Sequence, residues 1–236
     1  SSTMLTQHKL VIDLALQNMD KPIEISTTVG TSNFMGLEKY MVQEGMVYNF
    51  VKGDLTPKRN SFDAKYTADL IDSVFKFRGL GDGTAYINGE TERLLSGYVS
   101  LYLQISFDAR DKISTLRNTH PFTAERMSQV DSIAASAGKY LEMGMKQFPS
   151  EWRNYWAAAF VYEAAGQKAK AQDVVNRGLE NVPAYEEGGR ARLMMAARQI
   201  EQMSDEPLKV EEPVPAAPAD SLQKDSANEP AVVAAK

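Results

Sequence analysis

The chain has 236 residues, of which 43% are apolar and 24% are charged, and its formal net charge is -5. This composition is that of an ordinary globular protein with one large domain or two small ones. The negative charge argues against non-specific binding of nucleic acid, which needs clustered lysine and arginine. No run of about 18 apolar residues is present, so the sequence predicts no transmembrane segment.

Cysteine is absent, and the two histidines, His8 and His120, are far apart in the sequence. The chain therefore offers no disulfide, no thiolate metal site and no cysteine nucleophile. It also contains no phosphate loop of the Walker type and no Gly-x-Ser-x-Gly nucleophile motif. We accordingly expect a protein that is not an enzyme, with no catalytic residue, no metal and no cofactor.

Residues 1–120 have the pattern of a β-rich domain. Apolar and polar residues alternate over 61–70 and again over 97–110, which is typical of strands with one buried face. Shorter strand candidates, separated by Gly, Pro and Asp turn signals, are 9–17, 23–29, 46–52, 74–78 and 84–87. Several short strands at such spacing predict an antiparallel β-sandwich or open barrel.

Two segments of this half leave an alternative open. Residues 5–19 also fit a helix, but the alternation from Leu10 to Leu16 favours a strand. Residues 60–78 also fit one helix that Gly79 closes, and here the alternation at the start of the segment again favours a strand. We predict strands at both places.

The spacing of apolar residues changes to steps of three and four after Pro121, which is the helical period. Thr123 is a good N-cap for the first helix, and Pro149 ends it. The next helix, with Ser150 as its N-cap, stops at Gly166. Two more helices are predicted over 168–181 and 190–203, the last after a break at Gly188-Gly189.

The last segment, residues 204–236, contains no aromatic residue and five prolines. Such a segment cannot bury enough apolar area to offset the entropy lost on ordering. We therefore expect an α+β protein in three parts: a β-rich domain over 1–120, a helical domain over 121–203 and a disordered Pro/Ala/acidic tail over 204–236.

Small and aromatic residues follow a fixed order through residues 152–185: Tyr155, Ala158, Ala159, Tyr162, Gly166, Ala171, Val175, Gly178 and Pro183. This order resembles the tetratricopeptide repeat, a helix–turn–helix unit of about 34 residues. Small residues let the two helices approach closely, and the aromatic residues fill the space between them.

The second half of this pattern also occurs one repeat earlier. Four pairs of residues are each 34 positions apart: Ala137 and Ala171, Leu141 and Val175, Gly144 and Gly178, Pro149 and Pro183. The first helix of that earlier unit is missing from the pattern or is replaced by residues before Thr123. The resemblance thus implies about one and a half repeats plus a closing helix.

In the tetratricopeptide family the inner face of the first helix binds extended peptides. Carried over by position, the resemblance implies a partner-binding face made of Arg153, Trp156, Phe160 and Glu163. Two large aromatic residues beside a charge of each sign suit a peptide anchor. The alternative is that Trp156 and Phe160 pack on the β-rich domain.

We expect a non-enzymatic adaptor, or a structural subunit of a larger assembly, that binds protein partners and no nucleic acid. The alternative is a module that binds a glycan or small molecule on its β domain, which outward-facing Tyr98 and Tyr102 would favour. The start Ser1-Ser2-Thr3 resembles the residues after the lipidated cysteine of bacterial lipoproteins. That resemblance implies membrane anchoring through a preceding lipidated residue, in the periplasm or at the outer membrane, with the cytoplasm as the alternative.

Overall fold

The computed structural model describes residues 5–18, 20–34, 36–50, 62–204 and 208–211. These residues form seven α-helices, two 3-10 helices and one three-stranded sheet. The Ser/Thr start, the end of the 46–52 strand candidate and most of the expected tail (205–207 and 212–236) lie outside the described residues.

The N-terminal part is a small mixed unit. Helix α1 (Thr6–Gln17) precedes strands β1 (Glu24–Ser26), β2 (Met41–Glu44) and β3 (Val47–Phe50), and the 3-10 helices η1 (Thr31–Asn33) and η2 (Leu37–Tyr40) lie between β1 and β2. The sheet is antiparallel with the order β1-β3-β2. Gly45, at φ 62°, makes the tight turn between β2 and β3. Helix α2 (Ala64–Ser73) follows the sheet.

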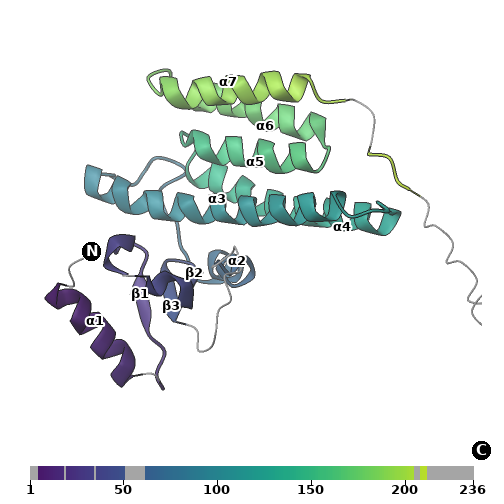
Figure 1. Ribbon diagram of the computed structural model, residues 1–236. Helices are drawn as coiled ribbons and strands as arrows, with labels where there is room; N and C mark the ends of the chain where they lie inside the picture. The colour runs from purple at the N-terminus through teal and green to yellow at the C-terminus, as the bar shows by residue number, and fades with distance from the viewer. Residues whose placement is uncertain (1–4, 19, 35, 51–61, 205–207, 212–236) are drawn as a thin grey trace, which may run out of the picture.

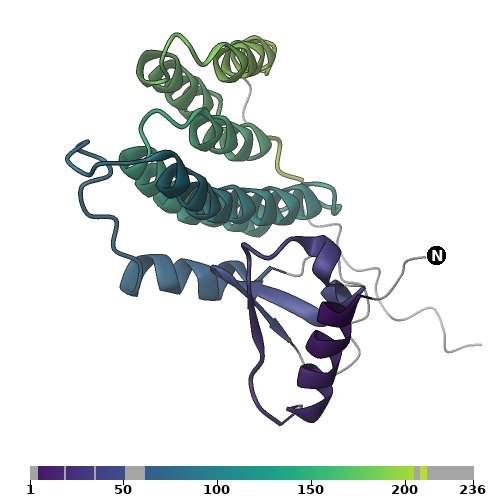
Figure 2. The same ribbon diagram turned by 90° about the vertical axis from the view of Figure 1, so that its left-hand side faces the viewer.

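The rest of the described chain is a stack of helices (Figure 1). Helices α3 (Gly89–Arg117) and α4 (Ala124–Gln147) form a long hairpin, and α5 (Trp152–Ala164) and α6 (Lys168–Asn181) form a shorter one beside it. Helix α7 (Glu187–Glu201) closes the stack, which Figure 2 shows from one end. Its largest fully buried side chains include Tyr102, Leu101, Ile113, Leu141, Val175 and Leu193.

The helices predicted after Pro121 are confirmed, with two local differences. The Thr123 hydroxyl caps α4 by accepting a hydrogen bond from Arg126 N at 3.4 Å. Helix α5 is capped by Glu151 and not by Ser150. Gly188 and Gly189 lie in the first turn of α7 and not in a break before it, and a Cβ atom at Gly189 would collide with the Trp152 ring.

The predicted β-sandwich or open barrel over residues 1–120 is wrong, because the described part of this segment is mainly helical and contains only the three-stranded sheet. Segments 23–29 and 46–50 do contain β1 and β3, and β2 is an additional strand. Segment 9–17 belongs to α1, residues 64–70 to α2, and residues 74–78 and 84–87 are not strands. The helical alternative forms at 5–19, as α1, whereas within 60–78 only Ala64–Ser73 are helical, and this helix ends well before Gly79.

Helix α3 shows why alternation predicted a strand. The N-terminal unit, α4 and α5 all pack against α3, so apolar residues occupy most of its circumference. Its buried residues include Val99, Tyr102, Ser106, Ala109 and Ile113, at helical steps of three and four, together with Leu101 and Ile105. A helix that is buried on several sides does not confine its apolar residues to one narrow face. Its apolar residues can then fall at every second position by chance, as they do over 97–110.

Each of the two hairpins contains an equivalent contact between a glycine of its second helix and a tyrosine of its first helix. A Cβ atom added at Gly144 on α4 would lie 3.0 Å from Tyr102 Cγ on α3, and one added at Gly178 on α6 would lie 2.9 Å from Tyr155 Cγ on α5. The two glycines are 34 residues apart but the two tyrosines are 53 residues apart, because the first hairpin is longer. The spacing of 34 therefore could not reveal α3, which takes the place of the missing first helix.

The N-terminal unit packs on the opposite side of the α3–α4 hairpin from α5 (Figure 1). On α2, the Asp72 carboxylate accepts hydrogen bonds from Lys139 Nζ at 2.7 Å and from Tyr140 Oη at 2.9 Å. The Gln104 amide on α3 donates to Gln43 Oε1 on β2 at 3.0 Å. The unit thus covers the end of the helical stack.

Residues 208–211, part of the expected tail, lie along the helical stack. Glu211 N donates to Phe122 O at 2.8 Å, and the Glu211 carboxylate accepts from Phe122 N at 3.1 Å. His120 Nδ1 lies 3.1 Å from the same carboxylate. Leu208 packs against the hydrophobic core beside Gly166. This stretch therefore joins the α3–α4 loop to the α5–α6 turn.

Candidate partner-binding groove

The four residues predicted to bind a partner, Arg153, Trp156, Phe160 and Glu163, all lie on α5. They are three or four residues apart, so they follow one another on successive turns of the helix. Trp156 stacks on Phe160, with ring centroids 4.9 Å apart and an interplanar angle of 22°. Both side chains are partly buried and pack beside the core without being enclosed by it. The stacked pair is therefore partly accessible to solvent.

Helix α3 forms one wall beside this pair. Phe107 meets Trp156 edge to face, with ring centroids 6.4 Å apart. The Arg110 guanidinium lies 4.0 Å from the centroid of the Phe160 ring, a distance at which a cation is attracted to the ring face. Phe107 is 43% exposed. Residues from the segment that the sequence assigned to the β domain therefore complete the aromatic face.

Helix α7 forms the other wall. A hollow of about 170 Å³ lies between α5 and α7, and its lining includes Trp156, Phe160, Glu163, Arg192 and Met195. Gln199 Nε2 donates to Glu163 Oε1 at 2.6 Å, so the carboxylate is held at the side of the hollow. We call the whole surface the α5 groove; it consists of Phe107, Arg110, Trp156, Phe160, Glu163, Arg192, Met195 and Gln199.

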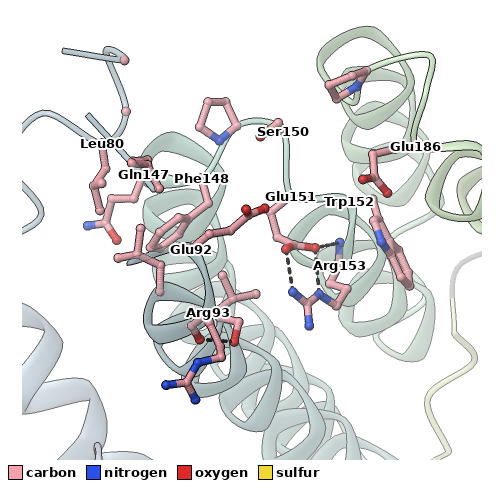
Figure 3. Close-up of a pocket in the computed structure, with 18 of the residues that line it drawn as sticks. Leu80, Glu92, Arg93, Gln147, Phe148, Ser150, Glu151, Trp152, Arg153 and Glu186 are labelled. Carbon is pink, nitrogen blue, oxygen red and sulfur yellow. Dashed lines mark hydrogen bonds and ion pairs between the residues drawn. The ribbon is translucent and has the colours of Figure 1, made fainter. Parts of the chain in front are cut away.

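Arg153 does not belong to this groove. Its guanidinium donates to both carboxylate oxygens of Glu151, at 2.8 Å and 2.6 Å, as Figure 3 shows. This hydrogen bonding raises the pKa of Arg153 further above its ordinary value. The structure therefore gathers three of the four predicted residues in one groove and places Arg153 in a separate cleft at the start of α5.

The alternative surroundings proposed for Trp156 differ from those observed. The sequence allowed packing on a β domain, whereas the aromatic neighbours of Trp156 are Phe107 on α3 and Trp152 and Phe160 on α5. Phe107 and Arg110 were missed as groove residues because their segment was assigned to a strand. In a helix, Phe107 and Arg110 are three residues apart and so lie on the same side. A helical interpretation of this segment could have used that spacing to find them.

The tyrosines that would favour a ligand site on the β domain lie elsewhere. Tyr102 is fully buried, and its hydroxyl donates to Gln147 Oε1. Burial raises the pKa of Tyr102 well above its ordinary value. Tyr98 packs edge to face on Phe75 and Phe77, with centroids 5.2 Å and 5.3 Å away. Neither ring presents an outward binding face.

Within the described residues, no group of three or more His, Asp or Glu side chains could hold a metal ion. None of the described helices combines the length and the apolar character needed to cross a bilayer. Comparison of the chain with protein-family models, with curated proteins and with solved structures finds no match. The functional proposal therefore rests on the geometry of the α5 groove.

Proposed function

We propose that this protein is a non-enzymatic interaction adaptor, or a docking subunit of a larger assembly, whose α5 groove binds an extended segment of a partner protein. The resemblance of residues 152–185 to a tetratricopeptide hairpin supports this proposal, because the inner face of such a hairpin binds peptides. By that resemblance, the α5 groove corresponds to the inner face of the hairpin.

The stacked pair of Trp156 and Phe160 is the observation that carries the proposal. Two large rings lie side by side, 4.9 Å apart, and still line an open hollow. Aromatic side chains dominate the binding energy of protein interfaces because they bury a large area at a small cost in conformational entropy. Met195, 68% exposed, adds an adaptable apolar contact on the α7 side.

Arg110 and Arg192 give the groove its polar contacts. Each guanidinium lies over an aromatic ring, Arg110 over Phe160 and Arg192 over Trp152. An arginine stacked in this way keeps its N–H donors free at the edge of the plane. We expect these donors to bind backbone carbonyls of the extended segment.

The test begins with peptides selected from a display library on the intact, immobilised protein. Affinities of the selected peptides are then measured for the wild type, Trp156→Ala and the control Tyr66→Ala, which removes a 49% exposed ring on α2. We expect Trp156→Ala to weaken binding about 30-fold, the loss typical of an aromatic hot spot, and Tyr66→Ala to leave binding unchanged.

The unfolding midpoint of each variant is measured first. A stability loss of about 3–5 kcal/mol in Trp156→Ala is the value for a deleted core indole, and it would mean that the groove is internal packing. Equal peptide affinity in the wild type and in a stable Trp156→Ala variant would also contradict the proposal.

A further inference from the structure

A second and larger hollow, which we call the loop-end cleft, lies where α3 and α5 begin (Figure 3). It has a volume of about 1180 Å³ and is open to solvent. Four segments that are far apart in the sequence line it: residues 80–89, the first turns of α3, the α4–α5 turn and the α6–α7 loop. The cleft has no residue in common with the α5 groove.

Apolar side chains line the loop-end cleft and stand at its opening. Phe148 and Trp152 form part of its wall. Ile87 and Tyr185 also line it, although they are 43% and 81% exposed, and neighbouring Tyr86 is 90% exposed. Single exposed apolar residues are ordinary, but several of them around one opening, with charges at the rim, are typical of a protein interface.

The charges of the cleft select the kind of partner. Its ionisable residues are four carboxylates and two guanidinium groups: Asp82, Glu92, Glu151, Glu186, Arg93 and Arg153. Both arginines already have acidic partners, Arg153 with Glu151 and Arg93 with Glu90 at 3.2 Å. Glu186 also interacts electrostatically with Arg153, after the stronger hydrogen bonding from Glu151, and the four carboxylates outnumber the two guanidinium groups. The cleft therefore has spare negative charge beside its apolar wall.

We propose that the loop-end cleft is a second docking site, which binds a segment of a partner protein in which lysine or arginine flanks a large apolar side chain. The apolar side chain would lie against Phe148 and Trp152, and the cations would meet Glu92 and Glu186. An acidic segment would meet the excess of carboxylates in the cleft, which disfavours it. This site adjoins the α5 groove, because Arg192 of the groove lies over the Trp152 ring, but the two share no lining residue.

The probe for this site is a labelled peptide with a Lys-Leu-Arg centre in a Gly/Ser background, measured by fluorescence anisotropy on the intact protein. Two matched peptides carry Glu-Leu-Glu and Lys-Ser-Arg centres. We expect the Lys-Leu-Arg peptide to bind most tightly and its affinity to fall with added salt, because screening weakens exposed charge pairs. Amide chemical shifts should move in residues 80–93, 147–153 and 183–187.

Glu92→Gln combined with Glu186→Gln should weaken binding about three- to tenfold, the loss expected for two partly exposed ion pairs. The matched control Glu180→Gln removes an exposed carboxylate of α6 outside the cleft and should change the affinity little. Tyr185→Ser tests the apolar contribution separately, because it alters no charge.

Three results would overturn the proposal: an equal loss in Glu180→Gln, equal binding of the Lys-Ser-Arg peptide, or shift changes located outside the cleft. Failure to bind the Lys-Leu-Arg peptide at millimolar concentration would overturn it as well.

Discussion

The ring of Tyr155 on α5 leaves no room for a side chain at Gly178 on α6, since a Cβ atom there would lie 2.9 Å from Tyr155 Cβ and 3.0 Å from Leu193 Cδ1. We therefore expect Gly178→Leu to lower the free energy of unfolding by about 1–3 kcal/mol, the usual cost of overpacking a close contact. Ala171→Leu should have a similar effect, because Ala171 is fully buried on the same helix. Urea unfolding measures both.

The matched control for Gly178→Leu is Gly188→Leu. Gly188 lies in the first turn of α7, and a Cβ atom there would have no neighbour within 4 Å. This variant should be neutral or slightly more stable, because leucine favours a helix more than glycine does. Unchanged stability in both Gly178→Leu and Ala171→Leu would contradict the close packing of α5 on α6.

Asn154 on α5 is a buried amide without a hydrogen-bond partner among the described residues. Leucine is also branched at Cγ, although its Cγ is tetrahedral and not planar, and it has no polar atoms to desolvate. Asn154→Leu should therefore raise the free energy of unfolding by about 1–3 kcal/mol, the range for an unsatisfied buried polar group. Asn154→Ala should be less stable than Asn154→Leu, because it leaves a cavity. A loss of stability in Asn154→Leu would show that the amide has a partner in solution.

Asp72 connects the N-terminal unit to α4, and hydrogen bonds from Lys139 and then Tyr140 lower the pKa of its carboxyl. A lowered carboxyl pKa adds stability that is complete above the unfolded-state pKa, about 3.9, and is lost as the pH falls through the folded-state pKa. Asp72→Ala should cost less than about 1 kcal/mol at pH 7, because the pair is partly exposed. This cost should shrink as the pH falls below the unfolded-state pKa, about 3.9, and vanish once the pH lies below the lowered folded-state pKa.

Urea unfolding of the wild type and Asp72→Ala over a series of pH values from 7 into the acid range measures this difference. The control is Asp69→Ala, whose carboxylate pairs with Lys65 within α2 and does not touch α4. It removes a carboxylate of the same helix and should leave the contact between α2 and α4 intact. A cost for Asp72→Ala that persists in acid would mean that the side chain acts through packing and not through its charge.

Glu211 fixes residues 208–211 to the α3–α4 loop. Hydrogen bonds from His120 and from Phe122 N lower the pKa of Glu211, so the contribution of the carboxylate to this attachment is complete near neutral pH and is lost as the pH falls through that lowered pKa. Glu211→Ala should speed hydrogen exchange at the Phe122 amide, which loses its acceptor. Val210→Ala, in the same segment, should not. Equal exchange in the two variants would mean that the attachment does not depend on the carboxylate.

The sequence alone determined the helices after Pro121, because their signals are local. The Thr123 hydroxyl caps α4, Gly166 at φ 74° allows the α5–α6 turn, and Pro183 follows α6. Each signal acts within a few residues, so it predicts structure without knowledge of distant contacts. The same local spacing placed Trp156 and Phe160 on one face of α5.

Only the tertiary structure decided the conformation of residues 89–117 and the walls of the α5 groove. Alternating apolar residues fit a strand and also fit a helix that is buried on several sides, and the packing of α4, α5 and the N-terminal unit around α3 selects the helix. Phe107 and Arg110 reach Trp156 and Phe160 across nearly fifty residues of sequence. No local pattern encodes such a meeting, because it depends on how two hairpins of different length stack on each other.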